Sequence, residues 1–221
     1  MKAPVKVVTV CVNYSDFLDL TLRNNIKILE KITIVTTPND KDTQDVCKKW
    51  GANIILSNAC YEDNAPFNKS KMINLALKKI YDSGYNGWVI HTDADILFDP
   101  NLTEILDFEN IDPRFLYSAH RYYIRTEEAL NAYKDGEGYN FNKLREDYID
   151  YKEFSMGCGY FQLFHSKHKR LYNEEFLAAD KSDEWFKNSF GRAISTSYFV
   201  SHLGEDGGLN WRGRTTERWR T

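Results

Sequence analysis

The sequence predicts an α/β fold, in which a central, mainly parallel mixed sheet lies between helices as a three-layer α/β/α sandwich. β-branched runs alternate with amphipathic helical patterns through the first hundred residues, and this alternation is typical of parallel sheets. Hydrophobic residues make up 42% of the chain and charged residues 28%, as in an ordinary globular protein with a sizeable core. The length of 221 residues suits one compact domain with a long insertion, so we expect residues 1–221 to form a single domain.

Four strands and three helices are expected in the first half of the chain. Ser15 can cap a first helix, because apolar residues follow it at near-helical spacing. Asp40 or Asp42 can start a second helix that Gly51 ends. Residues 67–81 are expected to form the third helix. The expected strands are residues 6–12, 32–36, 53–56 and 88–92. Ligands of such sheets bind beyond the carboxyl ends of the strands.

The second half of the chain differs in composition. Residues 133–152 are polar, rich in tyrosine and punctuated by glycine, which suits a loop or short helices over a site. Residues 182–190 are expected to form a short capped helix, and residues 204–208 a flexible glycine-rich loop. The expected strands are residues 115–125, 159–165 and 193–200.

Charge and cysteine content exclude several classes of protein. A formal net charge of −3 argues against a protein that binds nucleic acid through a broad basic surface. Neither CxxC pairs nor zinc-like spacing occurs among the four cysteines, Cys11, Cys47, Cys60 and Cys158. We therefore expect free thiols in a reducing compartment. No apolar run is long enough for a transmembrane segment, and no signal-like region opens the sequence, so a cytoplasmic protein is expected.

The strongest local feature is the apolar strand that runs into Asp93, Ala94 and Asp95. Period-two alternation would place both carboxylates on one side, where two unpaired acids among apolar residues would be costly. A bound Mg²⁺ or Mn²⁺ removes that cost and can also coordinate phosphate oxygens. The alternative is a structural origin, a capping acid plus a salt bridge. A second Asp-x-Asp triplet begins at Asp40, but a helix N-terminus explains its acids better.

These features together resemble glycosyltransferase family 2 and its relatives of the GT-A fold. The resemblance rests on the strand that ends in Val12, Asn13 and Tyr14, on the helix that opens at residues 67–71, and on the Asp-x-Asp strand, in that order. It covers the first hundred residues well and residues 157–164 and 202–214 more loosely. It implies that residues 1–100 bind the nucleotide sugar and metal, and that residues 101–221 bind the acceptor and carry a C-terminal lid.

The resemblance also implies roles for individual residues. Asp93 and Asp95 would hold a divalent cation, Mn²⁺ or Mg²⁺, and the triplet Asp93, Ala94 and Asp95 would bind the donor diphosphate. The end of the first strand and the loop after the second would hold the base and ribose. The second strand ends in Thr36, Thr37 and Pro38 instead of the acidic cluster common in the family, so Asp40 is the expected substitute. The predicted donor-binding residues of these two segments are Val12, Asn13, Tyr14, Thr36 and Asp40.

Two basic side chains are further candidates. Lys69 shares a helix face with residues that should pack on the sheet, yet it lies in the first turn, so it should either meet an anion such as a phosphate or extend to solvent. His202 resembles the third metal ligand that several GT-A enzymes supply near the C-terminus. Trp211 and Arg212 follow it as in a lid that closes on a donor. The arginine-rich residues 211–220 could otherwise be a basic patch or a frayed terminus.

An inverting transferase needs a general base for the acceptor hydroxyl. Asp183 and Glu184 resemble the acidic pair that serves this role in the family, although first-turn acids of a helix could look the same. Gly157 and Gly159 would let the backbone approach the sugar closely, or form a simple turn. His91 is expected to be a hydrogen-bonded core histidine.

The predicted function is therefore transfer of a sugar from a nucleoside-diphosphate sugar, with a uridine diphosphate donor favoured, to an acceptor hydroxyl. The acceptor could belong to a saccharide, lipid, protein or small molecule, and a modified DNA base is a further possibility. Two alternatives are a nucleotidyltransferase, whose glycine-rich signature is missing after Val12, and a non-catalytic sugar or nucleotide binding module. A pure binder should be indifferent to loss of the Asp183 carboxylate.

Overall fold

The computed structural model describes residues 3–136, 138–147, 159–179, 181–204 and 210–219. Its strands are β1 (Ala3–Val10), β2 (Leu29–Thr36), β3 (Asn53–Leu56), β4 (Trp88–Thr92), β5 (Ile96–Phe98), β6 (Leu116–Ile124), β7 (Lys134–Asp135), β8 (Gly138–Tyr139), β9 (Phe161–His165) and β10 (Ala193–Leu203). Eight of them form one sheet in the order β3-β2-β1-β4-β9-β6-β10-β5, and β7 pairs with β8.

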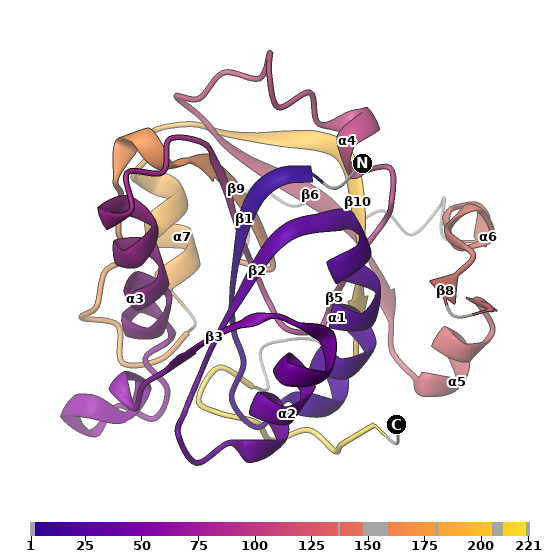
Figure 1. Cartoon of the computed structure of the whole chain (residues 1–221), viewed down its shortest axis with the longest axis horizontal. Coiled ribbons are helices and arrows are strands. Elements are labelled where there is room, and N and C mark those ends of the chain that lie inside the picture. The colour runs from indigo at the N-terminus through magenta and orange to yellow at the C-terminus, as the bar shows by residue number, and fades with distance from the viewer. Residues whose placement is uncertain (1–2, 137, 148–158, 180, 205–209, 220–221) are drawn as a thin grey trace.

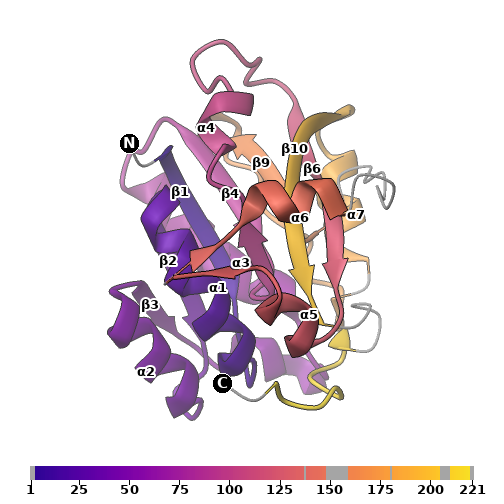
Figure 2. The same cartoon turned by 90° about the vertical axis from the view of Figure 1, so that its right-hand side faces the viewer.

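The helices lie between these strands. They are α1 (Ser15–Ile28), α2 (Lys41–Trp50), α3 (Lys69–Asp82), α4 (Leu102–Ile105), α5 (Glu127–Asn131), α6 (Phe141–Asp147) and α7 (Ser182–Asn188), with the short 3₁₀ helices η1 (Ala59–Asn64) and η2 (Ser166–His168). Figure 1 shows α1 and α2 on one face of the sheet and α3 and α7 on the other. In Figure 2, α5 and α6 lie outside the sheet, in front of β6 and β10.

Separate hydrophobic cores fill the two faces of the sheet. On the α1 face, Leu18 and Leu22 of α1 pack with Cys47 of α2 against inward-facing strand residues. On the α3 face, Met72 and Ile73 of α3 pack with Phe186 of α7, and all three side chains are fully buried. These stripes follow the helical spacing of apolar residues in the sequence. The predicted three-layer α/β/α arrangement is therefore confirmed.

The parallel half of the sheet agrees closely with prediction. β1 pairs in parallel with β2 and β4, and β2 with β3. The Asp40 side chain caps α2 by accepting a hydrogen bond from the Thr43 amide, and Gly51 ends the helix with φ of 76°. The Asn68 side chain caps α3 in the same way, through the Lys71 amide. Ser15 was expected to cap α1, but it is the first helical residue, and no side chain caps that helix.

The antiparallel half contains a strand that the sequence pattern did not predict. β9 pairs antiparallel with β4 and β6, whereas β10 runs parallel to β6. The unpredicted strand, β5, pairs antiparallel with β10, so the sheet is mixed but mainly parallel, as expected. β10 also extends to Leu203, beyond the predicted end at residue 200. Its extension includes His202, which therefore lies within a strand.

The cysteines and the expected glycine-rich loop lie only partly within the described residues. Cys11, Cys47 and Cys60 are buried free thiols, as predicted, whereas Cys158 lies outside the described residues. Gly157 and residues 205–208 of the expected glycine-rich loop also lie outside them. Within the described ranges, no helix is both long and apolar enough to cross a membrane.

Candidate functional site

A pocket opens beyond the carboxyl ends of β1 and β4, where ligands of α/β sheets bind. The predicted site residues that line it are Val12, Asn13, Tyr14, Lys69, Asp93, Ala94, Asp95, Asp183, His202 and Trp211. The other predicted residues, Thr36, Asp40, Glu184 and Arg212, do not line it. The fold thus brings together side chains from both halves of the chain.

Asp93 and Asp95 lie in the turn between β4 and β5, so strand alternation does not determine their directions. Asp95 is 8% exposed, and its Oδ2 lies 3.4 Å from His202 Nε2. The Leu203 amide donates to the Asp95 carbonyl oxygen at 2.9 Å, which holds β10 beside this turn. The second carboxylate oxygen of Asp95, Oδ1, is buried and has no hydrogen-bond partner among the described residues. An orphaned buried oxygen of this kind needs a partner, which a bound cation or a water molecule can supply.

Asp93 is turned the other way, toward Lys69. Lys69 Nζ lies 2.6 Å from Asp93 Oδ1 and 3.3 Å from Asp183 Oδ2, and the lysine side chain is 8% exposed. Burial alone would lower the pKa of Lys69, but Asp183 and Asp93 outweigh burial and raise it, so the ammonium stays charged. Lys69 therefore faces inward toward anions, and these anions are the carboxylates of the protein itself.

Asp183 enters the pocket from the first turn of α7. Burial raises the pKa of its carboxyl to about 6, against the opposing influence of Lys69. Its neighbour Glu184 is exposed and does not line the pocket. Asp183 also lies against Gly159, where an added Cβ would come within 1.7 Å of Asp183 Oδ2. The carboxylate therefore occupies space that only glycine leaves free.

A buried polar network lies behind Asp183. Tyr172 Oη donates to Gln162 Oε1 and lies 2.8 Å from His91 Nδ1, and Gln162 Nε2 donates to the Asp183 carbonyl oxygen at 3.0 Å. His91 is fully buried and hydrogen-bonded, as predicted, and burial lowers its pKa to about 3. This network holds the start of α7 on β9 and leaves a neutral histidine 3.9 Å from the Asp183 carboxylate.

Helix α1 holds the turn that carries the two acids. Thr21 Oγ1 donates to the Ala94 carbonyl oxygen at 2.7 Å. Asn25 Nδ2 donates to the Ile96 carbonyl oxygen at 2.8 Å, and its Oδ1 accepts from the Phe98 amide at 2.9 Å. Thr21 and Asn25 are both buried. The polar residues of α1 thus hold the backbone of the turn and of β5 in place. The apolar pattern of the helix did not predict this role.

The segment that follows β1 forms another wall of the pocket. Asn13 has a positive φ of 58°, and its amide donates to Asp40 Oδ2 at 2.7 Å. Thr36 Oγ1 donates to the same oxygen at 3.2 Å, and Asp40 Oδ1 accepts from the Thr43 amide. Both carboxylate oxygens of Asp40 are therefore used within the protein. Thr36 and Asp40, predicted to contact the donor, support Asn13 from behind the pocket.

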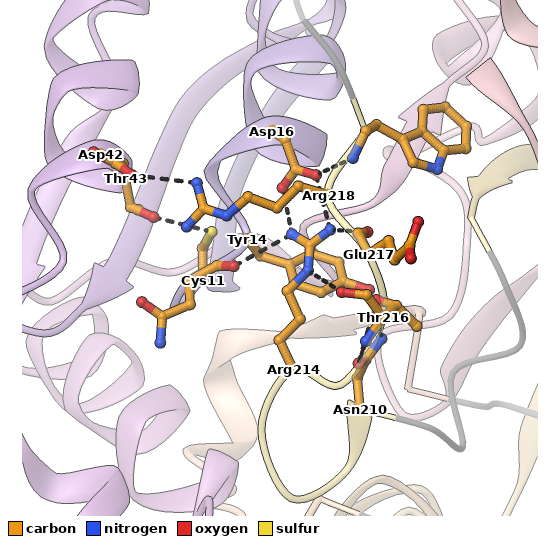
Figure 3. A network of polar contacts seen from close by, with 12 residues as sticks. Cys11, Tyr14, Asp16, Asp42, Thr43, Asn210, Arg214, Thr216, Glu217 and Arg218 are labelled. Atoms are coloured by element: carbon orange, nitrogen blue, oxygen red, sulfur yellow. Dashed lines mark hydrogen bonds and ion pairs between the residues drawn. The ribbon is translucent and has the colours of Figure 1, made fainter. Parts of the chain in front are cut away.

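The C-terminal segment packs over this wall, as Figure 3 shows. Arg214 forms a two-pronged ion pair with Asp16, and both side chains are almost fully buried. The frayed alternative for the tail is therefore wrong for the described residues 210–219. Trp211, which lines the pocket, and Arg212 are exposed. Sequence reasoning missed Asp16 and Arg214, because nothing local links two residues that are 198 positions apart.

Asp93, Asp95 and His202 are the candidate ligands of a divalent cation. As they stand, no three acidic, histidine or cysteine side chains of the described residues lie close enough together to hold one ion. Asp95 and His202 form a close pair with a free buried oxygen, whereas Asp93 is engaged by Lys69. A carboxylate and an imidazole suit Mn²⁺ or other divalent cations that keep positions open for a ligand.

The fold resembles that of several solved structures. Glucosyl-3-phosphoglycerate synthase from Mycobacterium tuberculosis, in complex with Mn²⁺, uridine diphosphate and glucosyl-3-phosphoglycerate, is 11% identical, with a TM-score of 0.51, over 91% of this chain and 72% of that chain. Mannosyl-3-phosphoglycerate synthase from Rubrobacter xylanophilus is 18% identical, with a TM-score of 0.52, over 93% and 67%. Inositol-1-phosphate CTP transferase from T. maritima is 10% identical, with a TM-score of 0.52, over 95% and 94%.

No family model and no curated protein matches the chain. At such low identities, the likeness to solved structures shows a shared fold. The predicted GT-A fold class is therefore confirmed.

Proposed function

We propose that this protein is a metal-dependent glycosyltransferase that moves a sugar from a nucleoside-diphosphate sugar to an acceptor hydroxyl. The observation that carries the proposal is the pocket in which Asp95 and His202 meet with an unpartnered carboxylate oxygen, next to Asp93, Lys69 and Asp183. A uridine diphosphate sugar is the favoured donor, since a synthase of this fold is known in complex with Mn²⁺ and uridine diphosphate.

The charge of the pocket supports a divalent cation. Asp93, Asp95 and Asp183 line it, and Lys69 is shared between two of these acids. A diphosphate would be repelled by this net negative charge unless a cation bound with it. Asp95 Oδ1 and His202 Nε2 would hold the cation, and Asp93 would join them by leaving Lys69. When bound, the cation would neutralise the charge that develops on the departing nucleoside diphosphate.

Asp183 is the proposed general base of an inverting transfer. Its Oδ2 is held by Lys69 at 3.3 Å, and its Oδ1 is buried without a hydrogen-bond partner among the described residues. Because Oδ1 is buried on the side of His91, 3.9 Å from its Nδ1, Oδ2 is the oxygen that would accept the proton of an acceptor hydroxyl. The pKa of about 6 places this group close to the range in which a base is effective near neutral pH.

The acceptor is proposed to have a flat or ring-shaped face. Tyr61 and Trp211 are 46% and 48% exposed, and both line the pocket. Exposed aromatic rings at a polar pocket are suited to stacking on a sugar or another ring. Among the broader possibilities of a saccharide, lipid, protein, small molecule or modified DNA base, these rings favour an acceptor that carries a ring, such as a saccharide.

Thermal denaturation tests the donor and the cation together. The Tm is measured with uridine, guanosine, cytidine or adenosine diphosphate, each with and without Mn²⁺. One of the four nucleotides should raise the Tm, and the other three should not. Ligand at one hundred times its Kd stabilises by about 2.7 kcal/mol. For a chain of this length, each kcal/mol raises the Tm by about 2–4 °C. Asp95→Asn should abolish the rise, whereas a rise of equal size without Mn²⁺ contradicts metal dependence.

Transfer assays separate the proposed enzyme from its alternatives. With the donor that binds, wild-type protein should release nucleoside diphosphate in the presence of saccharide acceptors, and Asp183→Ala should bind the nucleotide but release none. A nucleotidyltransferase would instead release pyrophosphate from a nucleoside triphosphate. A pure binding module would show nucleotide binding and no turnover with any acceptor. The missing glycine-rich signature after Val12 favours the glycosyltransferase over the nucleotidyltransferase.

A further inference from the structure

We infer that residues 210–219 form a fixed strap, anchored by Arg214, and that Arg214 is the residue that positions Asn13 and Tyr14 for binding of the donor. This inference rests on the proposed function for its link to the donor. The contacts of Arg214 carry it, because they join the strap to Asn13 in the segment that follows β1 and to Asp16 of α1 (Figure 3).

All five N–H donors of the Arg214 guanidinium are used within the protein. Nε donates to the Thr216 carbonyl oxygen at 3.0 Å. Nη1 donates to Asp16 Oδ1 and to the Asn13 carbonyl oxygen. Nη2 donates to Asp16 Oδ2 at 2.8 Å and to the Glu217 carbonyl oxygen at 2.6 Å. An arginine with no free donor cannot bind a phosphate without giving up a buried contact.

Two stacked aromatic rings also lie beside the guanidinium. Its central carbon lies 4.4 Å from the centre of the Tyr14 ring and 5.3 Å from the centre of the Phe17 ring. The side chains of Arg214 and Asp16 are only 7% and 5% exposed. A desolvated, bidentate pair beside aromatic rings is a strong contact, and breaking one partner of such a pair is strongly destabilising.

Other contacts fasten both ends of the strap. Asn210 Nδ2 donates to Tyr14 Oη at 2.6 Å, and Asn210 Oδ1 accepts from the Thr215 amide. At the far end, the Trp219 amide donates to Asp16 Oδ2 at 2.8 Å, and its ring packs 4.8 Å from Phe17. The strap is therefore fastened to Tyr14 at one end and to the first turn of α1 at Arg214 and Trp219, which is unlike a lid that lifts from its site.

Arg214 acts on the donor pocket through two neighbours. Asn13 is held from one side by Asp40, at its amide, and from the other by Arg214, at its carbonyl oxygen. This double hold keeps a non-glycine residue at positive φ, a backbone state that needs support from its surroundings. Tyr14 is held in the same way, between the guanidinium and Asn210. Both residues line the pocket, so Arg214 is a positioning residue for the donor.

Nucleotide binding by Arg214→Ala and Arg218→Ala tests the inference. Arg218 lies on the same strap and pairs with Asp42, but both side chains are more than half exposed, so it is the matched control. With Mn²⁺ present, Arg214→Ala should bind uridine diphosphate about tenfold or more weakly, because misplaced contact groups cost that much. Donor KM should rise accordingly and kcat should change less. Millimolar methylguanidinium should restore binding to Arg214→Ala but leave Arg218→Ala unaffected.

The opposite results overturn the inference. Wild-type affinity in Arg214→Ala, or equal losses in both variants, shows that Arg214 does not position the pocket. If Arg214→Ala does not fold, Asp16→Asn decides, because asparagine keeps the shape and removes the charge of the partner. Asp16→Asn should then weaken nucleotide binding while its Tm stays above the assay temperature, and unchanged binding contradicts the inference.

Hydrogen exchange separates the inference from the proposed function. In Arg214→Ala or Asp16→Asn, amides of residues 11–18 should exchange about tenfold faster than in wild-type protein, because the segment opens locally more often. Amides of α3 should be unaffected. If wild-type protein binds no nucleotide, the proposed function fails, and the exchange rates still decide whether Arg214 holds this segment. Unchanged exchange at residues 11–18 refutes the fixed strap.

Discussion

Single side chains show how the pocket keeps several charges buried. Lys69 lies between Asp93 and Asp183, within 2.6 and 3.3 Å of their oxygens, so its charge offsets theirs in the absence of a ligand. A buried lysine with no partner would lose its proton, whereas this one stays charged. If Asp93 held a cation, the Lys69–Asp93 ion pair would break, and the Lys69–Asp183 ion pair would remain. The same three residues therefore serve both the free and the proposed liganded state.

Adding a single methyl group at Gly159 should displace the proposed base. In Gly159→Ala, the new Cβ would come within 1.7 Å of Asp183 Oδ2 and 2.0 Å of its Cγ, so the proposed base must move. A displacement of about 1 Å at a reacting group can cost about a hundredfold in rate. We expect kcat to fall by about that factor while nucleotide binding, measured by thermal shift, changes little.

A second glycine provides the control for this substitution. At Gly138, an added Cβ would meet only the Asp135 carbonyl oxygen, at 3.8 Å, an ordinary contact distance. Gly138→Ala should therefore retain wild-type kcat. Full activity in Gly159→Ala would show that Asp183 is not the base, or that its position is not critical.

The raised pKa of Asp183 predicts the pH dependence of activity. With a pKa of about 6, the carboxyl is protonated below that pH and cannot accept a proton from the acceptor. The value of kcat/KM should therefore fall about tenfold for each pH unit below this pKa. His91, whose pKa is lowered to about 3, stays neutral across this range and adds no step of its own. A profile that stays flat down to about pH 4, the ordinary pKa of an aspartate, would exclude Asp183 as the base.

At the scale of elements, α1 shows that one helix can present two different faces. Its apolar residues Leu18 and Leu22 pack into the core, while Thr21 and Asn25 bind the backbone of the turn and of β5. The short strand β5 pairs with β10 on one side only, at the edge of the sheet. The polar face of α1 supplies backbone partners that a second neighbouring strand would otherwise provide.

Asn25→Ala should therefore weaken both the fold and the cation site. The substitution leaves the Ile96 carbonyl oxygen and the Phe98 amide buried without their partner, at about 1–3 kcal/mol for each stranded group. Urea denaturation should show this loss, and the loosened turn should weaken Mn²⁺ binding measured by calorimetry. Lys27→Ala, at an exposed position of the same helix, should change stability by less than about 0.5 kcal/mol. Wild-type Mn²⁺ affinity in Asn25→Ala would show that α1 does not position the acids.

At the scale of the whole molecule, the cores and the pocket occupy different places. The two main cores lie on the two faces of the sheet, whereas the pocket lies at its carboxyl edge, where loops and the C-terminal strap meet. The fold therefore does not depend on what the pocket binds. This separation of stability and binding is typical of open α/β sheets.

Chelation of metal should accordingly leave the fold intact. We expect excess EDTA to leave the circular dichroism spectrum and the Tm of the nucleotide-free protein unchanged, while it removes the rise in Tm that nucleotide produces. Addition of Mn²⁺ in excess of the chelator should restore that rise. Unfolding on chelation alone would instead indicate a structural metal, as in small zinc domains.

The spacing of residues along the chain was sufficient to predict most local elements of its first half and several residues that line the pocket. Residues 53–56 and 88–92 were predicted as strands with the bounds of β3 and β4, and Gly51 was predicted to end α2. Local patterns suffice there because strand alternation, helical periodicity and capping all act between near neighbours. The Asp-x-Asp triplet was found for the same reason, since its context is the strand that precedes it.

Only the tertiary structure decided which distant side chains meet. The pairing of β5 with β10 places His202 beside Asp95, the packing of α7 places Asp183 on Lys69 and against Gly159, and the strap joins Arg214 to Asp16. Hydrophobic spacing shows that a residue is buried but carries no information about its partner across the sheet. That partner is set by how whole elements pack, so sequence alone determined the fold class and the acidic motif, and packing determined the site.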